Sequence, residues 1–382
     1  MTIAVQKLPI DELCVQVTSG GTPSRKNAEY WQNGNINWLK TGELNDWYVG
    51  ESEEKINQKG LDGSSAKLFP ANTVLMAMYG DGKTITTLGV LNRPATTNQA
   101  CCAMIVDGAK CNYLYLLYAL KHHRNELLKL VVAGAQRNLS TGIIKKFPVT
   151  YFPLPKQERI ADYLSSYDKL IENNRRRIQL LEESARLLYQ EWFVHLRFPG
   201  HEQVKITDGI PEGWSKEPLE NLLVLQRGFD LPISKRVEGK VPIYASTGIN
   251  GFHNNAKVKG PGVVTGRSGS LGTVMYVAKD FWPLNTTLWV KEFKKSSPIF
   301  ATFLLRAMKL EGYNGGAAVP TLNRNDVHKV DVLCPDAKLM SEFEVQLEGI
   351  FKQIDKLKEF NEKLAQARDL LLPKLMSGEL TI

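Results

Sequence analysis

The feature that most constrains the fold is a stripe of core-type residues in the stretch from Pro153 to Phe193. Its members recur with alternating steps of four and three residues over more than four heptads, uninterrupted by Gly or Pro. They are Ile160, Leu164, Tyr167, Ile171, Asn174, Ile178, Leu181, Ala185, Leu188 and Trp192. This spacing predicts one long helix whose narrow apolar seam needs a partner helix.

The partner helix is predicted in the same chain, because adding 183 to each position gives a second stripe. That stripe consists of Phe343, Leu347, Ile350, Ile354, Leu357, Asn361, Leu364, Arg368, Leu371 and Leu375. Arg368 is its one charged member. The segments ahead of the two helices keep the same offset, since Leu139 matches Leu322 and Val149 matches Val332. The sequence therefore contains an internal repeat.

Each stripe carries one asparagine near its centre, Asn174 in the first and Asn361 in the second. If the two helices pack antiparallel with their stripes centred on each other, these two residues face each other. A buried amide pair of this kind costs stability but fixes the register and orientation of two helices. The alternative is that both asparagines lie on partly hydrated helix surfaces.

Two globular segments precede the two helices, and turn signals between short apolar runs predict α+β domains with many short strands. We expect a first globular domain at residues 1–152, a first helix at 153–196, a second globular domain at 197–335, and a second helix with a C-terminal tail at 336–382. A further helix is expected from about Asn112 to Val132.

The two globular segments are much less alike in sequence than the two helices. This contrast suits a device that reads two different targets at a fixed separation. A helix of about 35 residues is about 50 Å long, and one turn of B-DNA spans about 34 Å. Two domains at opposite ends of an antiparallel helix pair could therefore contact successive major grooves.

The composition indicates an intracellular protein with reduced, mostly buried thiols. Its five cysteines (Cys14, Cys101, Cys102, Cys111 and Cys334) include no CxxC pair, which argues against a disulfide framework or a zinc site. Neither a signal-like segment nor a membrane-spanning apolar run is present, so we expect a cytoplasmic location. The formal net charge of +8 fits a polyanionic partner such as nucleic acid, but it does not by itself identify one.

Three segments are similar to those of a known family. They read LPKQERIA at 154–161, VTGRSGSLG at 264–272 and LLPKLMSGEL at 371–380. On these segments and on its full-length repeat, the chain resembles the specificity (S) subunit of Type I restriction-modification enzymes. The second helix departs from the pattern, because PDAKLMS at 335–341 stands where the first copy has PKQERIA.

The resemblance implies a non-catalytic subunit whose two globular segments are target recognition domains, each for one half of a split, asymmetric DNA sequence. The conserved helices of the family imply a spacer and a docking site for two methyltransferase subunits and, through them, for restriction subunits. S-adenosylmethionine would belong to the methyltransferase subunits, and ATP and Mg²⁺ to the restriction subunits. We expect no cofactor or metal on this chain itself.

Loops rich in Arg, Lys, Asn, Gln and small hydroxyl residues are the candidate DNA-contacting surface, because these side chains read base edges and bind phosphates. In the first domain the candidates are Ser24, Arg25, Lys40, Thr41, Tyr79, Asp81, Lys83, Asn98, Gln99, Arg137 and Asn138. In the second they are Ser246, Thr247, Asn250, Arg267, Ser268, Ser270, Asn285, Thr286, Asn323 and Arg324. We expect Thr97-Asn98-Gln99 to occupy the place in the first domain that Leu284-Asn285-Thr286 occupies in the second. Each candidate could instead be an ordinary solvated loop residue.

Other readings of the sequence remain as alternatives. The chain could be a coiled-coil scaffold with protein-binding domains, or a solitary nuclease or methyltransferase. A nucleotide-binding P-loop is disfavoured, because Ala77 stands where the Gly ahead of Gly82-Lys83-Thr84 would be required. The basic run at 175–177 is either a solvated helix face or a contact to DNA phosphates or to acidic groups of a partner.

Overall fold

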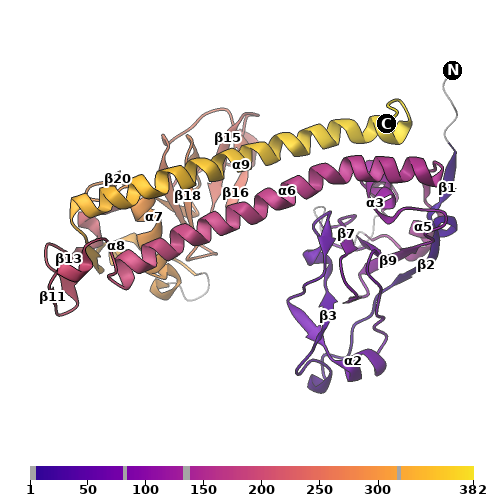
Figure 1. Cartoon of the computed structure of the whole chain (residues 1–382), viewed down its shortest axis with the longest axis horizontal. Helices are drawn as coiled ribbons and strands as arrows, with labels where there is room; N and C mark the ends of the chain where they lie inside the picture. The colour runs from indigo at the N-terminus through magenta and orange to yellow at the C-terminus, as the bar shows by residue number, and fades with distance from the viewer. Residues whose placement is uncertain (1–5, 81–83, 132–137, 316–319) are drawn as a thin grey trace. The chain divides into compact units, whose positions relative to one another are not determined.

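A computed structural model describes residues 6–80, 84–131, 138–315 and 320–382 (Figure 1). The chain forms two compact units. The first comprises Met1–Asn174 and Phe360–Ile382, and the second comprises Arg175–Glu359. Each unit contains one globular domain together with parts of both long helices.

The strands of the first unit form two main sheets. The five-stranded sheet has the order β2 (Cys14–Ser19), β9 (Cys101–Val106), β6 (Val74–Ala77), β7 (Leu88–Leu91) and β4 (Tyr48–Val49). The three-stranded sheet has the order β5 (Glu54–Ile56), β3 (Ile36–Leu39) and β8 (Thr96–Thr97). A separate antiparallel pair joins β1 (Lys7–Pro9) to β10 (Pro148–Thr150).

The helices of the first globular domain are short. They are α1 (Ile10–Leu13), α2 (Gln58–Asp62), α3 (Tyr113–His122), α4 (Arg124–Lys129) and α5 (Thr141–Lys146). The Asn112 side chain accepts hydrogen bonds from the first-turn amides of α3. The single helix expected from about Asn112 to Val132 is wrong, because His123 leaves the helical region and separates α3 from α4.

The second unit contains a four-stranded sheet and a three-stranded sheet. The first has the order β14 (Leu223–Arg227), β20 (Thr287–Phe293), β17 (Gly262–Gly266) and β18 (Val274–Val277); the second has the order β16 (Gly248–His253), β15 (Val241–Ala245) and β19 (Trp282–Pro283). β13 (Ser215–Pro218) pairs with β21 (Asp331–Cys334), and β11 (Ile206–Thr207) pairs with β12 (Ile210–Pro211). The helices are α7 (Pro298–Ala307) and α8 (Arg324–His328).

The two globular domains share one strand order. The order β2-β9-β6-β7 in the first unit matches β14-β20-β17-β18 in the second, and β5-β3-β8 matches β16-β15-β19. Individual hydrogen bonds also repeat, since Leu139 N donates to Met78 O and Leu322 N donates to Arg267 O, both at 2.8 Å. The predicted α+β class with an internal repeat is therefore confirmed. The main difference is the connection between the first two strands of the small sheet, which spans residues 40–53 with β4 in the first unit and only residues 246–247 in the second.

Two long helices complete the repeat. They are α6 (Leu154–Tyr189), which continues into one wide turn at Gln190–Val194, and α9 (Ala337–Ser377). In the first unit Ile160 and Leu164 share a core with Leu372 and Leu375. In the second unit Ile178 packs with Ile354 and Leu357, and the rings of Trp192 and Phe343 lie 5.7 Å apart. The predicted stripes therefore face each other, in antiparallel register, within each unit.

The polar members of the stripes also meet. Asn174 Nδ2 donates a hydrogen bond of 2.9 Å to Asn361 Oδ1, so the two amides face each other as the stripe spacing predicted. Arg368 forms an ion pair with Asp168, whose other carboxylate oxygen accepts a 2.5 Å hydrogen bond from the Tyr118 hydroxyl of α3. These polar contacts join the first globular domain to both long helices.

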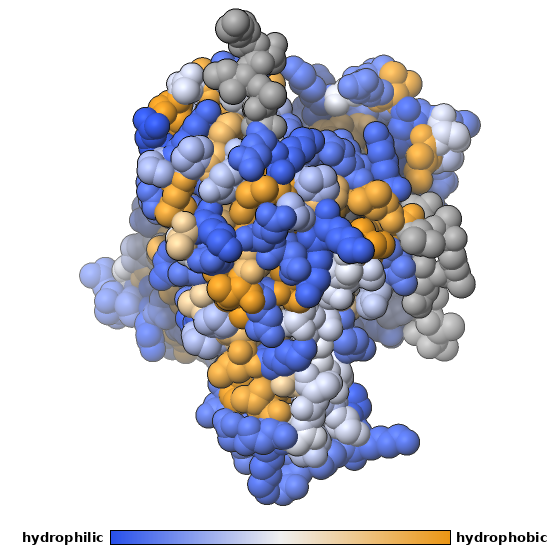
Figure 2. Space-filling model, turned by 90° about the vertical axis from the view of Figure 1, so that its right-hand side faces the viewer, coloured by the Kyte–Doolittle hydropathy of each residue, from blue (hydrophilic) through white to orange (hydrophobic). Residues whose placement is uncertain are grey.

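None of the described helices is both long and apolar enough to cross a bilayer. On the face in Figure 2, hydrophobic residues lie in small patches separated by hydrophilic ones. All five cysteines are free thiols, and all but Cys14 are buried. Burial raises the pKa of Cys102 and of Cys111 to about 12, so both thiols stay protonated at neutral pH.

Candidate DNA interface

In the second unit, three loops meet at the end of β17. Backbone hydrogen bonds hold them together: Arg267 N and Ser268 N both donate to Thr286 O, at 2.8 and 3.1 Å, and Leu322 N donates to Arg267 O. Ser268 also forms a bridge with Thr321. The loop after β17 therefore lies between the loop that precedes β20 and the segment that precedes α8.

This junction gathers three arginines, Arg227, Arg267 and Arg324. With Thr321, Asn323 and Asn325 they line an open cavity of about 400 Å³. Within the described part of the chain, none of the three guanidinium groups lies within ion-pair distance of a carboxylate. The Arg267 guanidinium donates one long hydrogen bond, of 3.4 Å, to Asn285 O. The cavity is therefore a cationic surface whose charges are available to an anionic ligand.

Three serine candidates lie close to Arg267 because Gly266 has no side chain. A Cβ at Gly266 would lie 1.8 Å from Ser270 O and 3.3 Å from the Cβ of Ser246. Glycine thus allows the turn between β15 and β16, which carries Ser246, to approach the loop with Ser268 and Ser270. Hydroxyl groups of this kind bind phosphates and base edges.

Five further candidates of the second domain differ in how many hydrogen bonds their side chains already make within the protein. Asn250 lies on β16, where its backbone and side-chain oxygens accept hydrogen bonds of 2.6 and 3.0 Å from Arg236. The Asn285 amide nitrogen donates to Asp230. Thr247 is exposed in the turn beside Ser246, and Asn323 uses its side-chain oxygen to cap α8. The buried Thr286 hydroxyl has no hydrogen-bond partner among the described residues.

The first unit builds the same junction from different side chains. Met78 takes the place of Arg267, since its amide donates to Ala100 O at 2.8 Å, and Tyr79 forms a bridge with Asn138. Met78 is buried, whereas Tyr79 and Asn138 are exposed. Among its described residues, the equivalent edge of the first domain therefore presents an aromatic ring and an amide.

The expected match of Thr97-Asn98-Gln99 with Leu284-Asn285-Thr286 is wrong by one residue. Asn98 N donates to Leu39 O at 2.9 Å, as Leu284 N donates to Tyr244 O at 2.8 Å, so Gln99 matches Asn285. Gln99 is exposed and accepts a hydrogen bond from the Thr22 hydroxyl. The side-chain oxygen of Asn98 is buried and has no partner in the described structure.

Two cationic candidates of the first domain are already paired within the protein. Arg25 forms an ion pair with Glu54 and stacks 3.9 Å above the Trp31 ring, while Lys40 Nζ lies 2.8 Å from Glu53 and 3.3 Å from Glu54. The hydrogen bond from Arg25, assisted by Lys40, lowers the pKa of the Glu54 carboxyl. These cations have to exchange a carboxylate for a phosphate in order to bind DNA.

The remaining candidates have simpler surroundings. Ser24 is exposed, and its carbonyl accepts a hydrogen bond from the Trp31 indole. Thr41 is half-buried at the start of a short helical turn. Asp81, Lys83 and Arg137 lie outside the described residues.

The sequence-based candidates omitted three polar residues that line the arginine cavity: Arg227, Thr321 and Asn325. The sequence did hold a signal for Arg227, because it ends an apolar strand and precedes Gly228, as Ser19 precedes Gly20 in the first copy. Gly20 N donates to Cys101 O and Gly228 N donates to Thr287 O, which establishes this match.

The described residues contain no cluster of three His, Cys, Asp or Glu side chains that could hold a metal ion. The basic run at 175–177 is exposed along α6.

Known proteins share both the sequence pattern and the fold. Residues 4–183 match a family model described as the Type I restriction modification DNA specificity domain. The chain is 26% identical to the Type I restriction enzyme MjaIX specificity subunit of Methanocaldococcus jannaschii, over 96% of this chain and 91% of the relative. It is 22% identical to the EcoprrI specificity subunit of Escherichia coli, over 93% of this chain and 88% of the relative.

A solved structure of a related protein has a similar fold. The crystal structure of a Type I restriction-modification system S subunit from M. genitalium matches with a TM-score of 0.58 at 17% identity. The match covers 98% of this chain and 96% of that chain. At this level of identity the match describes the fold, and it agrees with two repeated globular domains and two long helices.

Proposed function

We propose that the chain is a specificity subunit of a Type I restriction-modification system, which its similarity to such subunits supports. In this proposal it reads a split, asymmetric DNA site through two recognition domains. As a specificity subunit it is the DNA-recognition component and not the catalytic component. The domains are those at 1–152 and 197–335, and each reads one half-site.

One observation supports the proposal that the two half-sites of the DNA differ. Equivalent loops of the two domains hold equivalent backbone positions but present different side chains: buried Met78 and exposed Tyr79 in the first unit, and Arg267 and Ser268 in the second. Side-chain chemistry at base edges determines which bases are accepted. Two domains with one scaffold and different loop chemistry therefore recognise different half-sites.

The chemistry of the second domain favours a guanine. Arginine makes the commonest specific contact to guanine, a bidentate pair of hydrogen bonds to O6 and N7 in the major groove. Arg267 has no carboxylate partner among the described residues, so its guanidinium is available. Backbone hydrogen bonds to Thr286 and Leu322 fix the position of its main chain. Arg227 and Arg324, on the other walls of the same cavity, are suited to the flanking phosphates.

The two long helices at 153–196 and 336–382 act in this proposal as the spacer between half-sites and as the docking element for two methyltransferase subunits. The Asn174–Asn361 hydrogen bond and the Asp168–Arg368 ion pair support a fixed register, because a slip of either helix would leave buried polar groups unpaired. A fixed register implies a fixed gap between the half-sites.

The cofactors of the reaction belong to the partners. The methyltransferase subunits use S-adenosylmethionine to methylate adenine in each half-site, and restriction subunits recruited through them use ATP and Mg²⁺ when the site is unmethylated. The residues described here supply DNA recognition and assembly, and this chain binds none of these cofactors.

Selection from a random DNA pool tests this function. The purified chain, in complex with its methyltransferase subunit, is incubated with random duplexes, and the bound molecules are sequenced. We expect two short motifs at one constant gap. A complex that forms but enriches no sequence would support the scaffold alternative, in which the globular domains bind protein.

A further inference from the structure

The large sheet of the second unit ends at an open edge, whereas the corresponding edge of the first unit is covered. In the first unit β4 pairs in parallel with β7, through Tyr48 with Val90 and Val49 with Leu91. β18 is the counterpart of β7 and is the last strand of its sheet, and no described strand pairs with its outer edge. The short connection at residues 246–247 leaves no segment to fill this place.

In the first unit the covering segment satisfies the edge and buries an aromatic side chain. Asp46 N donates to Leu88 O at 2.8 Å, and Val90 N donates to Trp47 O at 3.0 Å. Trp47 is buried in the main core of the first unit, and the ammonium group of Lys121 on α3 lies 6.0 Å from its ring. The segment at 46–49 thus adds one strand to the sheet and one large side chain, that of Trp47, to the core.

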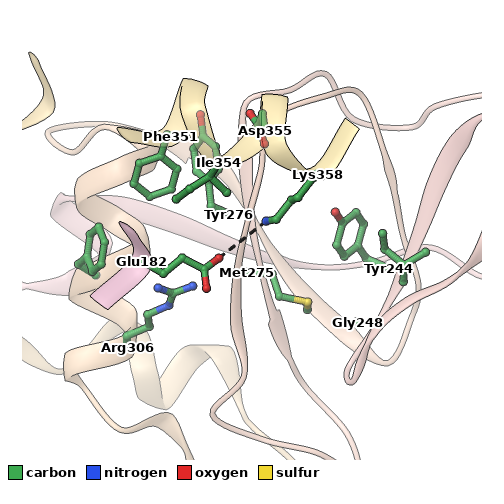
Figure 3. Close-up of a pocket in the computed structure, with 12 residues that line it drawn as sticks. Glu182, Tyr244, Gly248, Met275, Tyr276, Arg306, Phe351, Ile354, Asp355 and Lys358 are labelled. Atoms are coloured by element: carbon green, nitrogen blue, oxygen red, sulfur yellow. Dashed lines mark ion pairs between the residues drawn. The ribbon is translucent and has the colours of Figure 1, made fainter. Parts of the chain in front are cut away.

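The same place in the second unit is a cavity of about 260 Å³ (Figure 3). Arg306 holds on α7 the position that Lys121 holds on α3, and it reaches the cavity together with Met275 and Tyr276 of β18 and Phe351 of α9. The volume lies below the range of sites for drug-sized ligands, and it suits one large side chain.

The walls of the cavity are aromatic, and the strand edge beside it is only partly satisfied. The rings of Tyr276 and Phe351 meet edge to face at 4.6 Å. The Arg306 guanidinium donates to Val274 O at 3.2 and 3.0 Å, which is the place where Asp46 N binds Leu88 O in the first unit. By the same match, the amide of Tyr276 corresponds to that of Val90 and points to the open edge.

The cavity also carries a negative charge that lacks a close partner. Glu182 lies 3.8 Å from Lys358 (Figure 3), whereas Asp355 makes no hydrogen bond or ion pair with any described residue. Burial raises the pKa of the Asp355 carboxyl. A basic side chain beside the bound anchor would complement this carboxylate.

We propose that an extended segment of the methyltransferase subunit docks in this groove, pairs with the open edge of β18, and places an aromatic side chain in the cavity with a Lys or Arg beside Asp355. The proposal rests on the proposed function, from which it takes the partner. The groove is walled by α6 and α9, so it is continuous with the docking surface proposed for the helices. The first unit fills its own groove with Trp47, so only one of the two methyltransferase subunits makes this contact.

A variant that fills the cavity tests the proposal. Met275→Trp places an indole where the anchor would bind, and the matched control Ile233→Trp adds the same side chain at a residue that is 81% exposed and away from the cavity. Binding of the purified methyltransferase subunit is measured by titration. We expect Met275→Trp to weaken one of the two binding events at least tenfold, as for loss of an interface anchor, while Ile233→Trp leaves both unchanged.

Two measurements keep the test independent of whether Met275→Trp folds. In the unaltered complex, exchange of the Tyr276 amide should slow when the methyltransferase subunit binds. A photo-crosslinking residue at Ile249, an exposed residue on the cavity wall, should attach to one peptide of that subunit that contains an aromatic residue.

The outcomes separate this inference from the proposed function. A methyltransferase subunit that binds with unchanged amide exchange at Tyr276 and no cross-link at Ile249 overturns the groove contact and leaves the proposed function intact. A cross-link to a second copy of this chain also overturns it, because it assigns the groove to self-association. A methyltransferase subunit that does not bind at all contradicts the proposed function itself.

Discussion

Replacing Arg267 with alanine should weaken recognition of the second half-site without weakening the fold. The side chain is half-buried, pairs with no described carboxylate, and makes a single long hydrogen bond to Asn285 O. Its backbone contacts to Thr286 and Leu322 survive the substitution. We therefore expect the stability change to stay within about 0.5 kcal/mol, as for surface positions without strong side-chain contacts.

The expected loss of DNA affinity follows from the kind of contact. A bidentate arginine–guanine pair contributes about 1–3 kcal/mol of discrimination, which corresponds to a loss of roughly 5- to 150-fold at 25 °C. Lysine at the same position keeps the charge but loses the planar fork that matches guanine. Arg267→Lys should therefore recover the salt dependence of binding but only part of the sequence preference.

The assay is titration of the methyltransferase-bound complex with duplexes that vary one base pair at a time in each half-site. Arg186→Ala is the matched control, because Arg186 is an exposed arginine of α6 that pairs with Glu183. A selective loss at one guanine of the second half-site is expected. An equal loss of affinity for all sequences, with the slope of log affinity against log salt concentration reduced by about one, would show that Arg267 binds a phosphate. That result would refute the reading of a base by Arg267.

Four further predictions concern the helices. Replacing both Asn174 and Asn361 with leucine should raise the unfolding temperature and allow several gaps between methylated half-sites, and a lower unfolding temperature would contradict a costly amide pair. Asp168→Ala should cost about 3–5 kcal/mol in urea unfolding, because it removes the buried carboxylate that Lys121 and Arg368 share; a change below about 1 kcal/mol would count against a buried ion pair. Changing residues 175–177 to glutamine should flatten the salt dependence of DNA binding by up to about three units while the recognised sequence stays the same, and an unchanged slope would place the run away from phosphates. Adding one heptad, about 10 Å of helix, to each long helix should lengthen the gap between half-sites, and an altered half-site sequence would contradict a spacer role.

The helix pair could be predicted from the sequence because its pattern is local and repeated. Ten stripe positions at a constant offset define both helices, and the spacing alone brings Asn174 opposite Asn361. Arg368 looked like an isolated polar member of the second stripe. Its partner Asp168 lies one position outside the first stripe, so a pattern restricted to stripe positions does not reveal the pair.

The architecture of the two globular domains was only partly predictable. Short strands and turns are visible in the sequence, but the strand order depends on pairings between distant segments such as β2 with β9. The resulting match between the two units follows from backbone hydrogen bonds, and side chains on the reading loops have diverged. The one-residue error at Gln99 has this origin, since two amide residues in similar loops could be aligned in either register.

The candidate site was predicted best where several loop residues converge. Arg267, Asn323 and Arg324 do line one cavity, but Arg227 was missed because it belongs to a strand end. The ion pairs of Arg25 and Lys40 with Glu53 and Glu54 could not be foreseen, because 13 to 29 residues separate the partners in sequence. Charge type can be read from sequence, whereas availability of the charge depends on tertiary neighbours.

A single-molecule map of adenine methylation, on DNA from cells that express this chain with its methyltransferase subunit, tests the central claim most directly. Two recognition domains on a helix pair of fixed register predict one split motif, with two different short half-sites, a methylated adenine in each, and one constant gap. A single continuous motif, or a gap that varies between sites, would contradict the account. So would an unmethylated genome in cells where the two subunits form a stable complex.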